Sequence, residues 1–283
     1  MPFRNFSDKG INKELPINIY WFSGSGNSLI IAITIEETLT ASGYKVQLIP
    51  LEAANPASVG LNAVIGIVVP VAGQGTYPFI WEFLDGLPTS NGTPCFFVDT
   101  LAIYSGGILG PVKKILQRKG YKPLAAKEIL MPNIFQKLKS RPAREQKIID
   151  KGKKTAQQFC GKLINGRGSW WDIPGYSYLL SLMYRYRKLV VSWAKMFPLV
   201  IREEQCSRCG ICIKLCPEKS LVQDSEKRVI VDYAKCTLCH RCFAFCPSGA
   251  VTIGTRKAVV YRALPLKKLL GYLNSACKDR IQI

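Results

Sequence analysis

Two identical runs of four cysteines near the C-terminus constrain this 283-residue chain more than any other feature. Each run has the spacing C-x-x-C-x-x-C-x-x-x-C and is followed by proline. The first run is Cys206, Cys209, Cys212 and Cys216, and the second is Cys236, Cys239, Cys242 and Cys246. The opening segment MPFRNFSDKG has no continuous apolar stretch that would direct export, so we expect a cytoplasmic location. Cysteines that stay reduced there are more often metal ligands or catalytic thiols than disulfide partners.

A four-iron cube needs four thiolates, and this spacing supplies them. Two-residue gaps aim three successive sulfurs at one cube, whereas the fourth cysteine of each run lies too far along the chain to reach it. In two-cluster ferredoxins this fourth cysteine binds the other cube. We therefore expect two [4Fe-4S] clusters with crossed ligation. The first ligand set is Cys206, Cys209, Cys212 and Cys246, and the second ligand set is Cys216, Cys236, Cys239 and Cys242.

Two other metal groups use related cysteine patterns. Zinc is bound by paired C-x-x-C motifs, but it needs four ligands and not two runs of four. The segment from Cys236 to His240 reads C-x-x-C-H, a haem-attachment string, but haem would leave Cys242 and Cys246 without a purpose. Iron-sulfur clusters are therefore favoured, with His240 expected at the surface beside a cluster. The cysteines that have no partner motif, and that we expect to be inert, are Cys95, Cys160 and Cys277.

Residues 201–255 resemble the bacterial two-cluster ferredoxins, because every ligand position of that family is matched without a departure in spacing. β-branched runs at residues 227–232 (KRVIVD) and 250–254 (AVTIG) predict short strands. The resemblance implies a small α+β domain over residues 201–256, with electron transfer as its role.

The N-terminal half begins with a different pattern, in which an apolar run at residues 17–22 (INIYWF) is followed at once by SGSGNS and then by a helical pattern to about residue 40. A strand, a turn of small hydroxylated residues and a helix can together hold a phosphate. Backbone N–H groups, serine hydroxyls and the helix N-terminus then all face the anion. The candidate binding residues in this loop are Ser23, Gly24, Ser25, Gly26, Asn27 and Ser28.

Other phosphate-binding motifs fit this loop less well. A Walker A motif needs a lysine and a glycine spacing that are absent, and a dinucleotide-binding G-x-G-x-x-G motif needs glycine where Leu29 lies. ATP hydrolysis and NAD binding are therefore not expected. The loop resembles the FMN phosphate loop of flavodoxins, although Ser25 replaces the usual threonine.

Further strands are expected at residues 45–51, 63–69, 94–100 and about 127–131, and further helices at residues 79–87 and 109–119. Runs such as AVIGIVV are almost continuously apolar, which is typical of parallel strands that helices cover on both faces. The pattern predicts a flavodoxin-like α/β domain over residues 1–165, with a doubly wound parallel sheet of five strands. The second crossover, at residues 52–60, is short for a full helix.

Ligands of such a fold bind beyond the carboxyl ends of the strands, at the point where the strand order reverses. The loops after the third and fourth strands should therefore meet the flavin. Tyr77 or Tyr104 is the candidate for stacking on its ring, with ordinary loop packing an equal alternative. The expected contact residues in these loops are Pro70, Val71, Ala72, Gly73, Tyr77, Thr100, Leu101, Tyr104, Gly106 and Gly107.

Positive charge is concentrated between the two expected domains. Residues 110–200 carry 20 basic and 4 acidic side chains, within a net charge of +20 for the chain. Nucleic acid, an anionic membrane or an acidic protein would each suit such a segment. No nucleic-acid-binding motif accompanies it, so nucleic acid is not expected. We favour a redox partner protein with an acidic surface, such as a ferredoxin or an oxidoreductase, with a solvated basic face nearly as well supported.

Residues 166–200 are expected to form a basic linker with an amphipathic helix. Apolar residues recur there at helical spacing from Leu179 to Phe197, beside a stripe of arginine and lysine. Charges interrupt the segment too often for the ~20 apolar residues that cross a bilayer. Packing between the two domains is favoured over peripheral contact with a membrane surface. The C-terminal extension, residues 257–283, presents the same choice.

The whole arrangement resembles the flavodoxin-ferredoxin fusion proteins of anaerobic bacteria and archaea. The resemblance implies one FMN, two [4Fe-4S] clusters and a relay of low-potential electrons between them and a redox partner. An electron carrier is favoured because no acid/base or nucleophile constellation accompanies the flavin loops, so no catalytic residue is assigned. Two alternatives stay open, an FMN-dependent reductase of a small molecule fed by the clusters and an accessory donor that activates a metalloenzyme or radical enzyme.

Overall fold

The structure is a computed structural model of the chain. It describes residues 10–73, 75–103, 107–133, 141–171, 185–254 and 260–278.

The N-terminal unit is built on a five-stranded sheet in which every neighbouring pair of strands is parallel. Its strands are β1 (Ile17–Trp21), β2 (Val46–Pro50), β3 (Val64–Pro70), β4 (Pro94–Leu101) and β5 (Lys122–Leu130). Their spatial order is β2-β1-β3-β4-β5, so the order reverses beside β1. This is the flavodoxin order of the doubly wound fold, and it confirms the predicted fold class.

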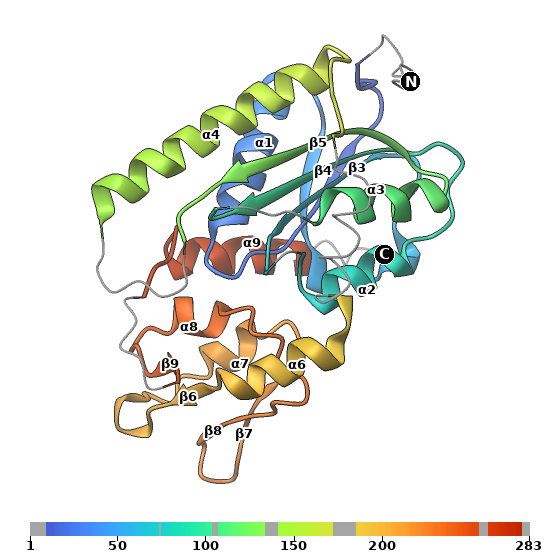
Figure 1. Ribbon diagram of the computed structural model, residues 1–283. Helices are drawn as coiled ribbons and strands as arrows, with labels where there is room; N and C mark the ends of the chain where they lie inside the picture. The colour runs from blue at the N-terminus through green and yellow to red at the C-terminus, as the bar shows by residue number, and fades with distance from the viewer. Residues whose placement is uncertain are drawn as a thin grey trace.

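Helices cover both faces of this sheet (Figure 1). They are α1 (Asn27–Ala41), α2 (Pro78–Gly86), α3 (Leu109–Arg118) and α4 (Pro142–Ile164). Two apolar clusters fill the space between the layers, one beneath α1 and α4 and one beneath α2 and α3. The central strands β3 and β4 contribute to both clusters, because alternate side chains of a strand point to opposite faces. This burial on both faces explains why their sequences are almost continuously apolar.

In the sheet unit the observed elements differ from the predicted ones at β5 and α4, whereas the expectation that the second crossover is too short for a full helix is confirmed. The strand predicted at residues 127–131 begins at Lys122, because β5 is an edge strand whose half-exposed residues, KPLAAKEIL, hide the apolar pattern. The short second crossover contains two 3₁₀ turns, Leu51–Ala53 and Pro56–Ser58, in place of an α-helix. Helix α4 was not predicted, although its buried residues Ile149, Ala156 and Leu163 lie seven residues apart on one face.

The C-terminal unit consists of two short helices and two small antiparallel sheets. Helices α7 (Ile211–Leu215) and α8 (Arg241–Phe245) occupy equivalent places in the two cysteine runs and contact each other. Strand β6 (Leu199–Ile201) pairs with β9 (Val251–Ile253), and β7 (Leu221–Gln223) pairs with β8 (Val229–Val231). A 3₁₀ turn, Glu203–Gln205, precedes the first cysteine. The strands predicted at residues 227–232 and 250–254 are thus present as β8 and β9.

Two further helices lie outside the two units. Helix α6 (Arg187–Met196) belongs to the predicted linker, of which residues 172–184 lie outside the described residues. Helix α9 (Leu266–Lys278) belongs to the C-terminal extension and lies between the sheet and the cysteine-bearing unit (Figure 1). It contacts β2, and its Leu269 is fully buried in the cluster beneath α1 and α4. Of the helices that the structure describes, none is both long and apolar enough to span a membrane.

Candidate functional site

The loop at residues 23–28 lies between β1 and α1, at the carboxyl edge of the sheet. Gly26 has φ of 97°, in the left-handed region that glycine adopts without a steric penalty, and it caps the N-terminus of α1. The first N–H groups of a helix have no partner within the helix, and together they favour an anion. The side chains of Ser23, Ser25 and Ser28 are all buried around this helix end.

Two hydroxyl groups of this loop retain donor capacity. Ser23 Oγ accepts a hydrogen bond of 2.9 Å from the N–H of Gly26, so its own hydrogen is not used in that bond. Ser28 Oγ lies 2.8 Å from Thr100 Oγ1. Because one hydrogen suffices to link two hydroxyls, this pair keeps a second hydrogen for a ligand. The loop can therefore offer hydroxyl donors and helix N–H groups to a phosphate.

The outer side of the loop is held by the C-terminal extension. The hydroxyl of Tyr261 donates a 2.9 Å hydrogen bond to Asn27 Oδ1, while Asn27 Nδ2 donates one of 2.8 Å to the carbonyl of Pro132. The N–H of Ala263 donates a 2.8 Å bond to the carbonyl of Ser25. Since Asn27 uses both ends of its amide on protein groups, it holds the loop in shape.

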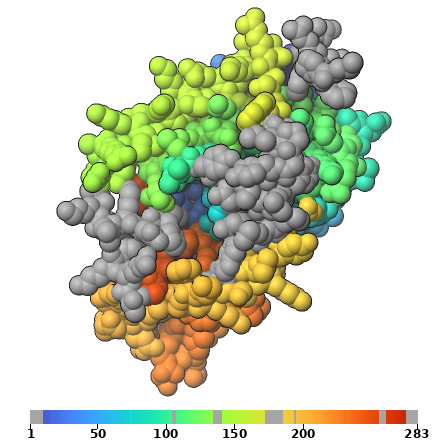
Figure 2. All heavy atoms as spheres, viewed as in Figure 1, coloured from blue at the N-terminus to red at the C-terminus, as the bar shows by residue number. Residues whose placement is uncertain are grey.

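A cavity opens at this loop, and ten of the predicted contact residues line it. They are Ser23, Gly24, Ser25, Asn27, Ser28, Pro70, Val71, Tyr77, Thr100 and Leu101. Ala102, in the loop after β4, and Met131, Pro132 and Asn133, which follow the edge strand β5, also line it and were not predicted. The space-filling view shows a hollow between the sheet unit and the cysteine-bearing unit, with N-terminal atoms at its base (Figure 2).

Of the six other predicted contact residues, four are described by the structure and do not line this cavity. Tyr104 and Gly106 lie outside the described residues. Gly26 packs against Leu264, and Ala72 forms an isolated bridge with Gly75. The two remaining residues are Gly73, which is exposed, and Gly107, which is buried.

Tyr77 contributes an aromatic wall to the cavity. Its ring stacks on Phe79 with a centroid separation of 5.8 Å and packs edge-on against Phe22 at 5.7 Å. Burial raises the pKa of its hydroxyl, so the group stays neutral at any ordinary pH. The Cys239 side chain packs against the apolar cluster that contains Tyr77, so the second ligand set lies close to the cavity wall.

We predict that Ser28→Ala weakens both the fold and anion binding. The substitution removes one hydroxyl from the loop and leaves the buried Thr100 hydroxyl without its hydrogen-bond partner. The expected loss is about 1–3 kcal/mol in the free energy of unfolding. Chemical denaturation of the flavin-free protein measures it, with the exposed Ser58→Ala as the matched control, expected within about 0.5 kcal/mol of the parent. An equal stability of both variants would contradict the prediction.

The pKa values of two thiols show which other cysteines lie near them. Burial raises the pKa of the Cys212 thiol to about 11, and the neighbouring charges of Cys246, Cys206 and Cys209 raise it further. Burial likewise raises the pKa of Cys242 well above its ordinary value, followed in strength by the charges of Cys239, Cys236 and Cys216, with Cys212 contributing least. The neighbours of Cys212 are thus the rest of the first ligand set, and the strongest neighbours of Cys242 are the rest of the second.

In the metal-free protein, the raised pKa values of Cys212 and Cys242 mean that these two thiols hold their protons near pH 7. Cluster binding requires thiolates, so loading would release protons. Among the described residues, no set of three or more His, Cys, Asp or Glu side chains could hold a single metal ion. The four thiolates around an iron-sulfur cube bind four different irons and therefore stand further apart than the ligands of one ion.

Hydrogen bonds to sulfur differ between the two ligand sets. The Ser220 hydroxyl lies 3.1 Å from Cys216 Sγ, and the Ser220 N–H donates to the same sulfur at 3.3 Å. In the other set, the Ser248 hydroxyl lies 3.6 Å from Cys246 Sγ. Such bonds stabilise the more negative, reduced form of a cluster and so raise its potential.

His240 is buried, and the prediction of a surface histidine was wrong. Only 8% of its surface is exposed, and its φ of 60° places it at the N-terminus of α8, where Gly210 has the equivalent position before α7. Burial lowers its pKa to about 4, so the ring is neutral near pH 7. The repeat explains the conformation, because both cysteine turns need a left-handed residue there.

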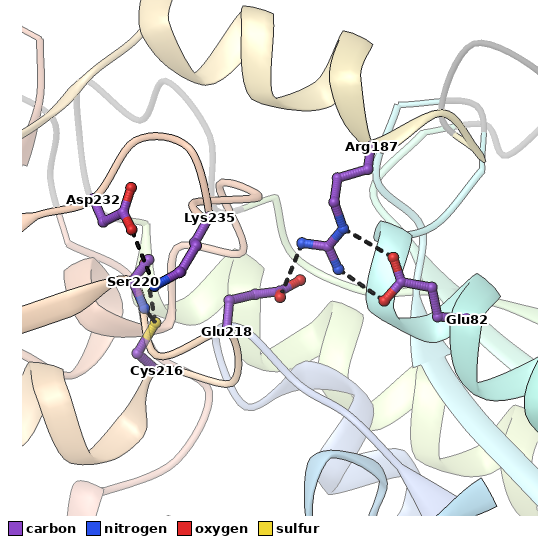
Figure 3. A network of polar contacts seen from close by, with 7 residues as sticks. All are labelled: Glu82, Arg187, Cys216, Glu218, Ser220, Asp232 and Lys235. Carbon is purple, nitrogen blue, oxygen red and sulfur yellow. Dashed lines mark hydrogen bonds and ion pairs between the residues drawn. The ribbon is translucent and has the colours of Figure 1, made fainter.

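An arginine of the linker connects the two units (Figure 3). The guanidinium of Arg187 on α6 forms a two-bond fork to Glu82 on α2, at 2.9 and 2.8 Å, and donates a third bond of 3.0 Å to Glu218. Glu218 follows the ligand Cys216 by two residues. The favoured prediction that the linker helix packs between the domains agrees with these contacts, although Leu189, Met196 and Phe197 remain exposed.

Comparisons with known proteins identify the C-terminal unit. Residues 205–251 match the model of the 4Fe-4S dicluster domain family. A search of curated proteins found no match.

Solved structures similar to this chain include several flavodoxins. One from Streptococcus pneumonia TIGR4 is 15% identical, with 52% of this chain and 96% of the flavodoxin covered at a TM-score of 0.38. Megasphaera elsdenii flavodoxin gives 19% identity, coverages of 50% and 98%, and a TM-score of 0.36. Flavodoxin 2 from Bacillus cereus gives 18% identity, coverages of 52% and 99%, and a TM-score of 0.40. The fold assignment itself rests on the strand order and the parallel connections described above.

Proposed function

We propose that this chain, which joins a flavodoxin-like unit to a 4Fe-4S dicluster domain, relays electrons between two [4Fe-4S] clusters and one bound FMN. The observation that carries the proposal is the contact between the two sites. A Cβ atom added to Gly24 of the phosphate loop would lie 2.2 Å from the carbonyl oxygen of Cys239. The loop that would hold a flavin phosphate and a turn that would hold a cluster therefore touch.

The residues at the cavity fit FMN. Serine hydroxyls and the N-terminus of α1 suit its phosphate, and the Tyr77 wall together with Pro70 and Val71 suits an apolar ring. Bound FMN would exchange electrons singly or in pairs, whereas each cluster exchanges one at a time. The chain's own residues fix the distance between the two sites, because the Cys239 carbonyl packs against Gly24.

Two supports bear on the proposed cluster count. The family match spans both cysteine runs, and each run supplies four cysteines at the same spacing. We assign the first ligand set to one cluster and the second ligand set to the other.

The proposed partner is a redox protein with an acidic surface. The basic residues of α4, among them Lys147, Lys151 and Lys154, are exposed to solvent. Electrostatic steering by this face would raise the association rate at low salt. If the rate of electron exchange with the partner protein were the same at low and high ionic strength, the partner proposal would be wrong and the cofactor proposal would stand.

An anaerobic preparation assayed for iron, sulfide and flavin tests the proposed function. We expect about eight irons, about eight sulfides and one FMN per chain. Reduction of the protein by a one-electron donor should bleach the flavin without any added substrate. Zinc in place of iron, or a preparation that binds no flavin, would overturn the proposal. A saturable oxidation of the reduced protein by one small molecule would instead favour a reductase, and a stable complex with one acceptor enzyme would favour an accessory donor.

A further inference from the structure

The internal repeat allows the two cysteine turns to be compared position by position. Cys209-Gly210-Ile211-Cys212 in the first run corresponds to Cys239-His240-Arg241-Cys242 in the second. Gly210 and His240 share the left-handed conformation, with φ of 71° and 60°. The next position differs in kind, because the second run has a buried arginine where the first has isoleucine. Only 1% of the surface of Arg241 is exposed.

Arg241 ties three distant segments together. Its Nε donates a 2.9 Å hydrogen bond to the carbonyl of Ser23 in the phosphate loop. Its Nη1 forms an ion pair with Glu52 in the turn after β2 and lies 3.4 Å from the carbonyl of Leu215, the residue before the ligand Cys216. Its guanidinium carbon lies 4.3 Å from the centre of the Phe22 ring. A planar fork can make these contacts at once, which an ammonium group cannot.

The two ligand sets differ in their distance from the flavin loop. Cys239 packs against the apolar cluster that contains Phe22 and Tyr77, and its carbonyl touches Gly24. Its equivalent in the first run, Cys209, is exposed to solvent. One set thus faces the cavity, and the other reaches the outside of the molecule.

We propose that the cluster of the second ligand set is the one that exchanges electrons with the flavin, and that Arg241 is the positioning residue that holds it there. The cluster of the first ligand set then exchanges electrons with the external one-electron redox partner. Each electron that leaves the second cluster oxidises it by one electron and reduces the flavin by one, and the first cluster restores it. This inference rests on the proposed function and adds an order to the relay.

The test uses full-length protein loaded with FMN and both clusters. Three variants address the buried pair: Arg241→Met removes the cation, Arg241→Lys keeps the charge without the fork, and Glu52→Gln removes the anion. Arg228→Met is the matched control, because Arg228 pairs with Asp224 and Glu226 on the surface of the β7-β8 hairpin. The midpoint potential of each cluster is measured by EPR-monitored redox titration.

The cluster signals are assigned with two serine variants. Ser220→Ala removes a hydroxyl beside Cys216 and should lower the potential of the second cluster, whereas Ser248→Ala should lower that of the first. Arg241→Met should then lower the potential of the cluster that Ser220→Ala moves. A tenfold fall in its reduction equilibrium corresponds to about 59 mV for a one-electron couple. Glu52→Gln should raise the midpoint potential of the same cluster, and Arg228→Met should change the midpoint potential of neither cluster.

Rapid-mixing measurements of flavin bleaching test the positioning role. After one-electron reduction of the clusters, Arg241→Lys should bleach the flavin more slowly than the parent protein while its cluster potentials stay close to the parental values. The inference would be overturned if Arg241→Lys and the parent protein bleached the flavin at equal rates. It would also be overturned if Arg241→Met shifted the midpoint potentials of both clusters equally, or only that of the cluster whose potential Ser248→Ala lowers. A parent protein that lacks flavin or iron would instead refute the proposed function. If Arg241→Met does not load its cofactors, Arg241→Lys and Glu52→Gln still decide the outcome.

Discussion

Replacing Cys216 with alanine should abolish the cluster of the second ligand set and leave the cluster of the first, although Cys216 lies inside the first cysteine run. The physical reason is reach, because the three-residue gap before Cys216 carries its thiol away from the first cube and towards Cys236 and Cys242. The strongest electrostatic neighbours of Cys242 include Cys216, which agrees with this assignment. We expect iron to fall from about eight to about four per chain.

The reciprocal variant and a control complete this experiment. Cys246→Ala should abolish the first cluster and keep the second. The surviving cluster in Cys246→Ala should therefore respond to the Ser220→Ala substitution, and the surviving cluster in Cys216→Ala should not. Cys160→Ala, at a buried thiol of α4, should leave the iron content unchanged. If Cys216→Ala removed the cluster whose potential Ser248→Ala lowers, each cysteine run would bind its own cluster and the crossed assignment would be wrong.

The sequence predicted those parts of the site that follow from short-range patterns. The strand, the loop at residues 23–28 and α1 are contiguous, so their order in the chain indicates a phosphate site directly. A parallel doubly wound sheet could be inferred because apolar runs alternate with helical stretches, and its strand order followed from the resemblance of the loop to flavodoxins. The cluster ligands could be predicted because the two-residue gaps between the cysteines are visible in the sequence and correspond to a known cluster-binding turn.

The contacts between the units could not be predicted in this way. Arg241 and Ser23 are 218 residues apart, and Tyr261 and Asn27 are 234 apart, so no local pattern links them. No role was predicted for Arg241, and His240 was expected at the surface. Comparison of the two cysteine runs offered one signal, since an arginine at a position where the first run has isoleucine suggests a buried partner.

The C-terminal extension shows how packing resolves an ambiguous amphipathic pattern. Its apolar residues suit either a membrane surface or another part of the protein. In the structure, Leu264 and Leu269 are buried in the cluster beneath α1 and α4, and Leu264 also touches Gly26 of the phosphate loop. The extension therefore supports the loop from outside, so the proposed flavin site depends on residues from both ends of the chain.

Asp99→Asn should stabilise the protein, and the stabilisation should be larger at pH 8 than at pH 5. Asp99 lies near the end of β4 and is fully buried, and neither carboxyl oxygen has a hydrogen-bond partner among the described residues. Burial raises its pKa well above the ordinary value, and Glu128, its register partner on β5, raises it further. The folded protein thus keeps a proton that the unfolded chain loses above about pH 3.9.

The sign of the pH dependence follows from this difference in bound protons. Because the folded state binds more protons, the free energy of unfolding falls as pH rises from the unfolded pKa towards the folded one, by up to about 1.4 kcal/mol per pH unit. The neutral amide of Asp99→Asn does not titrate, so the gap between variant and parent should widen with pH. Thermal unfolding midpoints of the loaded proteins, compared at pH 5 and pH 8, measure this gap. The exposed Asp150→Asn serves as the control for replacing a carboxyl group with an amide. A parent protein that loses no stability relative to Asp99→Asn between these pH values would mean that Asp99 is ionised and compensated in the fold.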